Sequence, residues 1–84
     1  MKTFLVFIQR KPGFTGASIP GHREHLTQLR EQDRIVLAGG FPDQTGGAYV
    51  VKAEDHEAAA KLVELDPMFA ENECVYVVKE WNAQ

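Results

Sequence analysis

Two histidines spaced one helical turn apart are the first residues in this chain that could do chemistry. His22 and His25, together with Leu26 and Leu29, fit the i, i+3, i+4, i+7 spacing of one helix face. Histidine has an ordinary pKa of about 6.5, so His25 could act as a general acid or base at neutral pH. The simpler alternative is a histidine that is only hydrogen-bonded on the flank of a helix.

A His-x-x-His pair on a helix could also hold a metal ion. A third and a fourth ligand are not apparent, because His56 is expected at the start of another helix and Cys74 at the start of a strand. We therefore expect no metal site, and His22 is either a second polar residue of a pocket or a surface residue. His56 is expected to be exposed, and Cys74 to be a small buried hydrophobe.

Asp66 stands directly before Pro67, where the chain is pushed out of the α-helical region and a helix must end. The helix dipole does not favour a carboxylate at the C-terminal end of a helix. Such a mismatch between a residue and a local rule is a small hint of function for Asp66. The alternative is structural, with the carboxylate bracketing an Asp-Pro turn.

Aromatic and glycine residues supply further candidates for ligand contacts. Phe69, Tyr49 and Trp81 could wall a pocket for a flat ligand, although packing in the core or in a subunit interface is the simpler role. The pair Gly39–Gly40 could let a ligand approach the backbone closely, whereas Gly46–Gly47 is typical of a turn. The candidate ligand-binding residues are therefore His22, Gly39, Gly40 and Phe69.

The elements that must position these residues alternate as strand, helix, strand, strand, helix, strand. Apolar and β-branched runs predict strands at residues 3–8, 35–38, 48–52 and 74–81. Residues 21–33 predict the first helix, and Asp55 can cap a second helix that Pro67 stops. This order is the split βαβ pattern of a ferredoxin-like α+β fold with a four-stranded antiparallel sheet. Right-handed crossovers would place both helices on one face of that sheet.

The strands carry apolar side chains on both faces, although the helices can cover only one. Side chains alternate between the two faces of a sheet along each strand. In the first strand, Phe4, Val6 and Ile8 would lie on one face, and Leu5 and Phe7 on the other. Opposite faces would likewise receive Ile35 and Leu37 versus Val36 and Ala38 in the second strand, and Val75 and Val77 versus Tyr76 and Val78 in the last. An uncovered face of this kind would be a large adhesive patch. The same face of a second copy is the simplest cover, so we expect a homodimer, with a higher oligomer left open.

Composition and charge narrow the class of protein. The chain has 84 residues, 44% hydrophobic and 25% charged, which suits one domain over residues 1–84. A net charge of −3 and the lack of a basic track argue against a nucleic-acid partner. The single cysteine excludes a disulfide within the chain. No stretch is long and apolar enough for a signal sequence or a membrane span, so we expect no membrane partner and a cytoplasmic location.

Several short motifs, in their order and spacing, resemble the YciI-like (YCII-related) family across nearly the whole chain. They are His25-Leu26, Ile35-Val36-Leu37-Ala38-Gly39-Gly40, Gly46-Gly47, Glu57-Ala58-Ala59, Leu65-Asp66-Pro67-Met68-Phe69 and Val77-Val78-Lys79-Glu80-Trp81. The resemblance implies a dimeric α+β barrel in which two ferredoxin-like sheets pack face to face. The family often has an arginine where this chain has His22. Arg23 could replace that charge, but it would point elsewhere on the helix.

The resemblance also implies a pocket with a catalytic histidine and aspartate, which match His25 and Asp66. In such a pair Asp66 would accept the ring N–H of His25, fix its tautomer and stabilise the imidazolium. A related member is a dehydrochlorinase of a chlorinated hydroquinol, and muconolactone isomerases share the wider fold. We therefore expect a cofactor-independent lyase or isomerase that moves a proton on a small cyclic or aromatic metabolite.

Two other classes of function stay open. One fold hosts many functions, so the protein could be a non-catalytic small-ligand-binding or regulatory module. A deep pocket in which His25 and Asp66 do not meet would favour that class. A haem- or oxygen-using protein of the wider group would need a larger cavity than a chain of this length readily forms.

Overall fold

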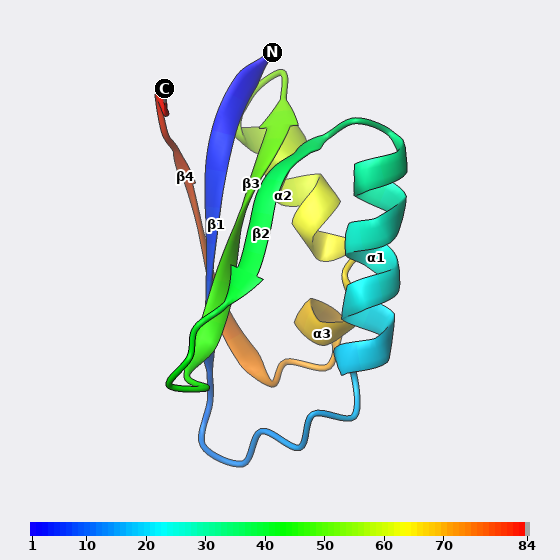
Figure 1. Ribbon diagram of the computed structural model, residues 1–84, viewed down its shortest axis with the longest axis vertical. Helices are drawn as coiled ribbons and strands as arrows, with labels where there is room; N and C mark the ends of the chain where they lie inside the picture. The colour runs from blue at the N-terminus through cyan, green and yellow to red at the C-terminus, as the bar shows by residue number, and fades with distance from the viewer. Residues whose placement is uncertain (84) are drawn as a thin grey trace.

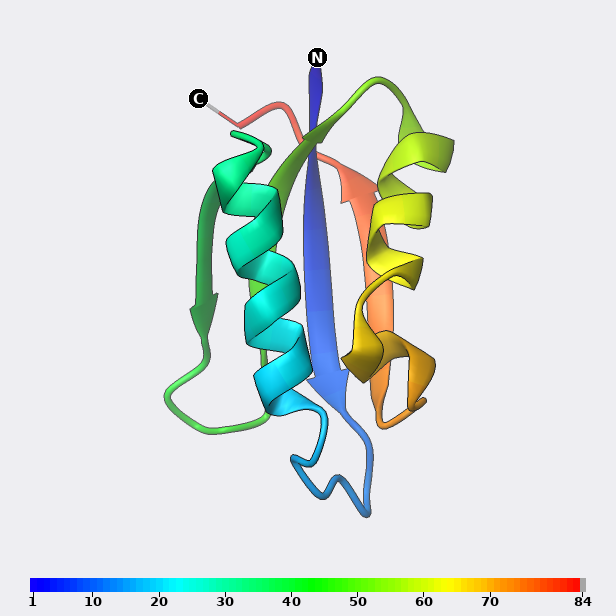
Figure 2. The same cartoon turned by 90° about the vertical axis from the view of Figure 1, so that its right-hand side faces the viewer.

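Four strands form one antiparallel sheet in the computed structural model, which describes residues 1–83. The elements are β1 (Lys2–Arg10), α1 (Ile19–Glu31), β2 (Ile35–Gly40), β3 (Gly46–Ala53), α2 (His56–Glu64), α3 (Pro67–Ala70) and β4 (Cys74–Glu80). The strand order is β2-β3-β1-β4, and all three helices lie on the same face of the sheet (Figures 1 and 2). This is the ferredoxin-like α+β fold that the sequence predicted. No helix within residues 1–83 is long and apolar enough to cross a membrane.

The core lies between the sheet and the helices. Every second residue of β1, namely Phe4, Val6 and Ile8, is at most 3% exposed. Tyr49 and Val51 of β3 pair with Val6 and Phe4 and share that face, because partners in an antiparallel ladder point the same way. Burial of a side chain of this size contributes about 1.5–3 kcal/mol, so this alternation fixes which face of the sheet receives the helices.

The first helix begins two residues earlier than expected. Ile19 and Pro20 form its first turn, where proline is tolerated because its missing N–H has no partner in a helix start. The predicted cap of α2 is confirmed, since the Asp55 side chain accepts a hydrogen bond of 2.8 Å from the Ala58 backbone N–H.

The surroundings of Asp66 differ from the prediction. The helix α2 ends at Glu64, and a short helix α3 that the sequence patterns did not predict begins at Pro67. Asp66 is the N-cap of α3, and its Oδ1 atom accepts a hydrogen bond of 2.9 Å from the Met68 backbone N–H. The expected conflict with the helix dipole was therefore wrong, because this carboxylate lies at a helix N-terminus.

The second strand contains a β-bulge that changes which residues face the core. Ile35 pairs with Val51 and Leu37 pairs with Val50, so Val36 is the extra residue. The prediction that Leu37 shares the face of Ile35 was wrong. After the bulge, Leu37 is 63% exposed, and Ala38 packs against the core instead.

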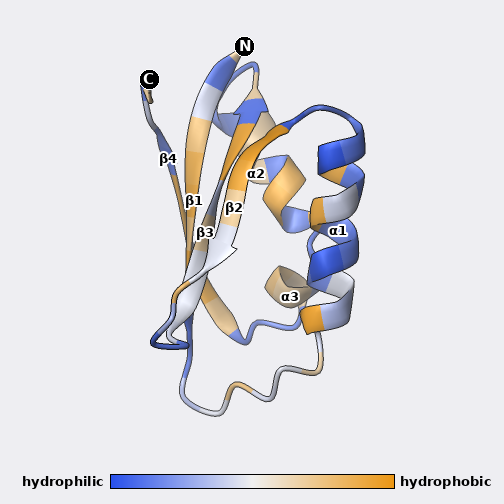
Figure 3. Ribbon diagram, in the orientation of Figure 1, coloured by the Kyte–Doolittle hydropathy of each residue, from blue (hydrophilic) through white to orange (hydrophobic). Residues whose placement is uncertain are grey.

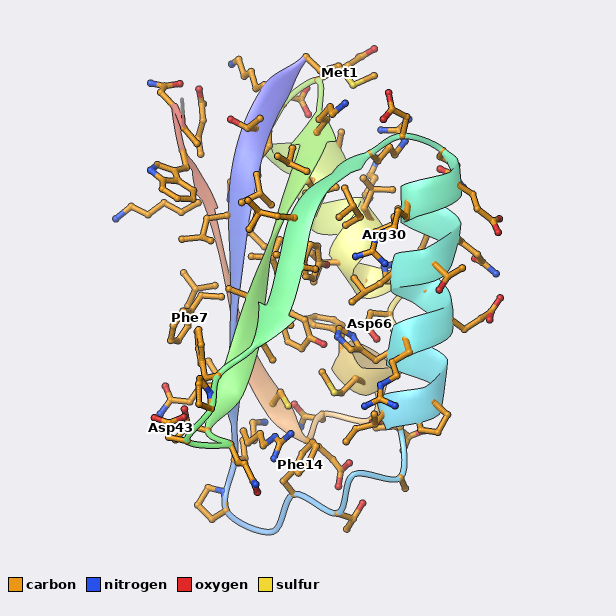
Figure 4. The ribbon with its side chains drawn as sticks, in the orientation of Figure 1. Met1, Phe7, Phe14, Arg30, Asp43 and Asp66 are labelled. Carbon is orange, nitrogen blue, oxygen red and sulfur yellow. The ribbon has the colours of Figure 1, made fainter. Side chains whose placement is uncertain are left out.

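The sheet face away from the helices is apolar and uncovered in the single chain. Phe7 points away from the helices (Figure 4), and much of the strand surface is hydrophobic (Figure 3). The exposed apolar side chains on this open face include Phe7, Leu37, Val75, Val77 and Trp81. The prediction of apolar side chains on both sheet faces is confirmed for β1 and β4.

Candidate functional site

A buried carboxylate, a histidine and a tyrosine meet where α1, α3 and β4 come together. The Nδ1 atom of His22 lies 2.6 Å from Oδ2 of Asp66. The hydroxyl of Tyr76 donates a hydrogen bond of 2.8 Å to the same oxygen. The Asp66 side chain is fully buried, whereas that of His22 is 15% exposed. This cluster holds a histidine ring in one orientation and leaves part of it accessible.

Asp66 is held in its charged form. Burial alone would raise the pKa of its carboxyl, but the hydrogen bond and charge of His22, the Met68 N–H and the Tyr76 hydroxyl together lower that pKa below its ordinary value. An ionised carboxylate only accepts hydrogen bonds, so Nδ1 of His22 carries the ring proton. Whenever this ring carries a single proton, its Nε2 atom is the acceptor. Burial, reinforced by the hydrogen bond to Asp66, raises the pKa of Tyr76, which keeps its hydroxyl protonated.

The expected hydrogen bond between His25 and Asp66 is absent, and His22 takes the place that the sequence patterns assigned to His25. His25 is 7% exposed, and its Nε2 atom has no hydrogen-bond partner. Burial lowers the pKa of His25, although the nearby charge of Asp66 acts in the opposite direction. His25 is therefore a buried imidazole whose neutral form is favoured, and His22 rather than His25 reaches Asp66.

A close approach of two helices explains why His22 reaches Asp66. A β-carbon on Gly21 would lie 3.0 Å from Cγ of Pro67, so only glycine lets α1 come this near to α3 without a shift. Gly21 precedes His22 and Pro67 follows Asp66, so this contact places the two functional side chains side by side. The glycine inside a helical run was the signal in the sequence that could have identified this pair.

A cavity of about 280 Å³ lies next to His22, between α1 and the ends of β1, β2 and β3. Ligand pockets usually start at about 300 Å³, so its size suits a small molecule. Its lining includes the predicted residues His22, Gly39 and Gly40. His25, Asp66 and Phe69 are not part of the lining; Phe69 instead packs edge-on against Tyr76, with ring centroids 5.3 Å apart.

Tyr49, which the sequence offered as a possible pocket wall, and three arginines that were not predicted as site residues also line the cavity. Tyr49 lines the cavity, and its buried hydroxyl has no hydrogen-bond partner. Arg10, Arg23 and Arg30 also line it. The expectation that Arg23 points elsewhere on the helix was wrong. The spacing of Arg23, Leu26 and Arg30 at i, i+3 and i+7 was the signal for a shared helix face.

The remaining candidates are not part of the cluster formed by His22, Asp66 and Tyr76. His56 is exposed at the start of α2, as predicted, and its Nε2 atom lies 3.0 Å from the Val78 carbonyl oxygen. Cys74 is buried, as predicted, and lines the cavity. Trp81 is 48% exposed and lies beyond the end of β4, so it does not wall the cavity.

The fold and the site together define a small ferredoxin-like domain with a ligand-sized cavity beside an oriented histidine. The family model of the YCII-related domain matches residues 2–82, so the chain belongs to that family, as its motifs predicted. YjpA of Bacillus subtilis (strain 168), an uncharacterised protein, is 37% identical over 81 residues, which cover 96% of this chain and 95% of YjpA.

One solved structure shares the fold closely. It is the 5-chloro-2-hydroxyhydroquinone dehydrochlorinase TftG from Burkholderia phenoliruptrix AC1100, in complex with 2,5-dihydroxybenzoquinone. The TM-score is 0.75, the identity is 24%, and the match covers 98% of this chain and 95% of TftG. At this level of identity the likeness is one of fold.

Proposed function

We propose that this protein is a cofactor-independent enzyme that moves a proton on a small cyclic or aromatic compound, with His22 as the general acid–base and Asp66 as the residue that orients it. The observation that carries this proposal is the hydrogen bond of 2.6 Å between Nδ1 of His22 and the buried carboxylate of Asp66, on the wall of a cavity. A dehydrochlorinase with the same fold is compatible with such chemistry.

The arrangement suits proton transfer for a simple chemical reason. Because Nδ1 is committed to Asp66, Nε2 can accept a proton from a carbon or hydroxyl of the bound ring. The imidazolium that forms is stabilised by the adjacent carboxylate, whose position is fixed by Tyr76 and the Met68 N–H. Return of the proton to another ring atom gives an isomerisation. In an elimination, the electron pair left behind by the proton forms a new π bond, and the leaving group departs with the electron pair of its own bond to the ring.

A binding module without catalysis is the competing class. Its expected sign was a pocket in which His25 and Asp66 do not meet, and these two residues indeed form no hydrogen bond. The physical requirement for catalysis is an oriented imidazole at the pocket, however, and His22 meets that requirement. This favours the enzyme over the binding module.

Proton exchange and chloride release test the proposal with a panel of compounds rather than with one natural substrate. The protein is incubated in D₂O with cyclic ketones, enols and lactones, and deuterium incorporation is followed by NMR. Chloride release from 5-chloro-2-hydroxyhydroquinone is measured in parallel. We expect wild-type protein to exchange or eliminate at least one compound, His22→Gln to lose this activity, and His56→Gln to retain it. Binding of panel compounds without exchange or release by the wild type would support the binding module instead.

We also propose that the protein works as a homodimer joined through the open face of the sheet. That face carries Phe7, Val77 and Trp81 at 39%, 50% and 48% exposure, which is unfavourable for an uncovered surface. A second copy offers the same apolar face, so a two-fold contact would bury both.

A further inference from the structure

Three arginines without ionic partners surround the cavity beside His22. Arg10 comes from the end of β1, whereas Arg23 and Arg30 lie two helical turns apart on α1. Arg30 reaches from α1 toward the sheet (Figure 4). The guanidinium of Arg10 lies 4.4 Å above the centroid of the Phe14 ring, which holds it at the loop edge of the cavity.

No acidic residue balances these charges. The cavity lining contains no aspartate or glutamate, and within residues 1–83 none of the three arginines forms an ion pair. Two acidic groups on neighbouring segments have other partners: Asp66 binds His22, and Glu73 accepts two hydrogen bonds of 2.8 Å from Thr15. The cavity is therefore cationic in a chain whose net charge is −3.

The other polar groups of the lining have complementary roles. Burial raises the pKa of Tyr49, so its unpartnered hydroxyl stays protonated and can donate a hydrogen bond. The Nε2 atom of His22 is the proton acceptor. A ligand that matches this set presents negatively charged or strongly accepting oxygens to the arginines and a removable proton to His22.

We propose that the cavity selects a small organic acid, a ring compound that carries a carboxylate or an ionised enol held by Arg10, Arg23 and Arg30. This inference rests on the cavity of the proposed function and names the class of its substrate. Binding of the anion requires the arginines but not His22, whereas proton transfer requires His22. The proposal of an anion site and the proposal of proton transfer can therefore each be contradicted while the other holds.

A matched pair of probes isolates the charge. Benzoate and benzamide have nearly the same size and shape, but only benzoate is anionic at neutral pH. Each is titrated into isotopically labelled protein, and Kd is obtained from amide chemical shifts, with 2,5-dihydroxybenzoquinone, whose hydroxyls are acidic, as a second anionic probe. The variants are Arg10→Gln, Arg23→Gln and Arg30→Gln. Arg34→Gln is the control, because Arg34 lies outside the cavity lining.

We expect the anionic probes to bind at least about tenfold more tightly than benzamide, and each cavity variant to lose about tenfold in affinity, because hydrogen bonds to charged groups are the strong ones. Affinity should also fall as salt is added. His56→Gln, at an exposed residue outside the cavity lining, should bind benzoate as the wild type does.

Equal affinity for benzoate and benzamide would overturn the inference, as would cavity variants that bind like Arg34→Gln. If neither anionic probe binds saturably at millimolar concentrations, the inference is overturned as well. If anions bind through the arginines but no ring compound exchanges a proton, the proposed catalytic function fails and the anion site stands.

Discussion

Gly21 of α1 packs against Pro67 of α3 so closely that a β-carbon at position 21 would lie 3.0 Å from Cγ of the proline. His22 directly follows Gly21, and Asp66 directly precedes Pro67. The Nδ1 atom of His22 lies 2.6 Å from Oδ2 of Asp66. A packing contact between two residues without functional groups thus sets the geometry of the candidate catalytic pair.

The substitution Gly21→Ala should therefore affect the site more than the stability. Alanine is favoured over glycine inside a helix by about 1 kcal/mol, which offsets part of the cost of pushing α1 away from α3. We expect an apparent melting temperature within a few degrees of the wild type and about a tenfold loss of proton-transfer activity. Gln28→Ala, on the exposed side of the same helix, is the control. Unchanged activity in Gly21→Ala would show that the spacing of the two helices is not critical.

The charge of Asp66 should matter for both rate and stability. Asp66→Asn keeps the shape of the side chain, but it can no longer stabilise an imidazolium at His22. General acid–base catalysis contributes about 10²–10⁴-fold, and we expect a loss of at least the lower value in kcat. Loss of charged hydrogen bonds should cost about 1–3 kcal/mol in the free energy of unfolding.

Tyr76→Phe provides a graded comparison to Asp66→Asn. It removes one hydrogen bond of 2.8 Å to Oδ2 and leaves the carboxylate charged. Its activity should lie between those of the wild type and Asp66→Asn. A Tyr76→Phe variant less active than a folded Asp66→Asn variant would contradict the role given to the carboxylate.

The stability of the protein should fall on mild acidification because of His25. Burial lowers the pKa of His25 in the folded state below its ordinary value of 6.5. The unfolded chain therefore binds a proton at higher pH than the folded chain does. The contribution of neutral His25 is present above pH 6.5 and is lost as pH falls from there through the lowered pKa of the folded state.

Thermal melts of wild-type protein and His25→Leu between pH 7.5 and pH 5 isolate this effect, since leucine fills similar space without titrating. The wild type should lose stability relative to His25→Leu as the pH falls. A difference in melting temperature that does not depend on pH would show that His25 is free to ionise in the folded protein.

Oligomeric state tests the role of the open face. We expect sedimentation to give twice the mass of one chain for the wild type. Val77→Glu places a charge on the apolar face and should shift the equilibrium towards single chains. Gln28→Glu adds the same charge on the exposed side of α1 and should leave the assembly unchanged. A wild-type protein that sediments as a single chain at micromolar concentration would rule out this interface.

Sequence patterns predicted the fold well because it is determined by local rules. The alternation of Phe4, Val6 and Ile8 identified the core face of β1, and Asp55 was recognised as a cap from its position alone. The bulge at Val36 was missed because an extra residue in a strand leaves no periodic signature when the residues around it are all apolar.

The site was predicted less completely, since it depends on how helices pack. His22 and His25 lie on the same helix face, and no sequence rule decided which ring would reach Asp66 across the fold. The short helix α3 follows an Asp-Pro pair that is equally typical of a turn, so the capping role of Asp66 was not evident. The contact between Gly21 and Pro67 joins positions far apart in the sequence, which no local pattern specifies.

The most direct measurement compares deuterium exchange into a ring substrate by His22→Gln and His25→Leu, each shown to be folded by its melting curve. Transfer of the proton by Nε2 of His22 predicts that His22→Gln loses exchange by at least about a hundredfold, whereas His25→Leu stays within a few-fold of the wild type. Full exchange by His22→Gln, or its loss in a folded His25→Leu, would contradict that assignment.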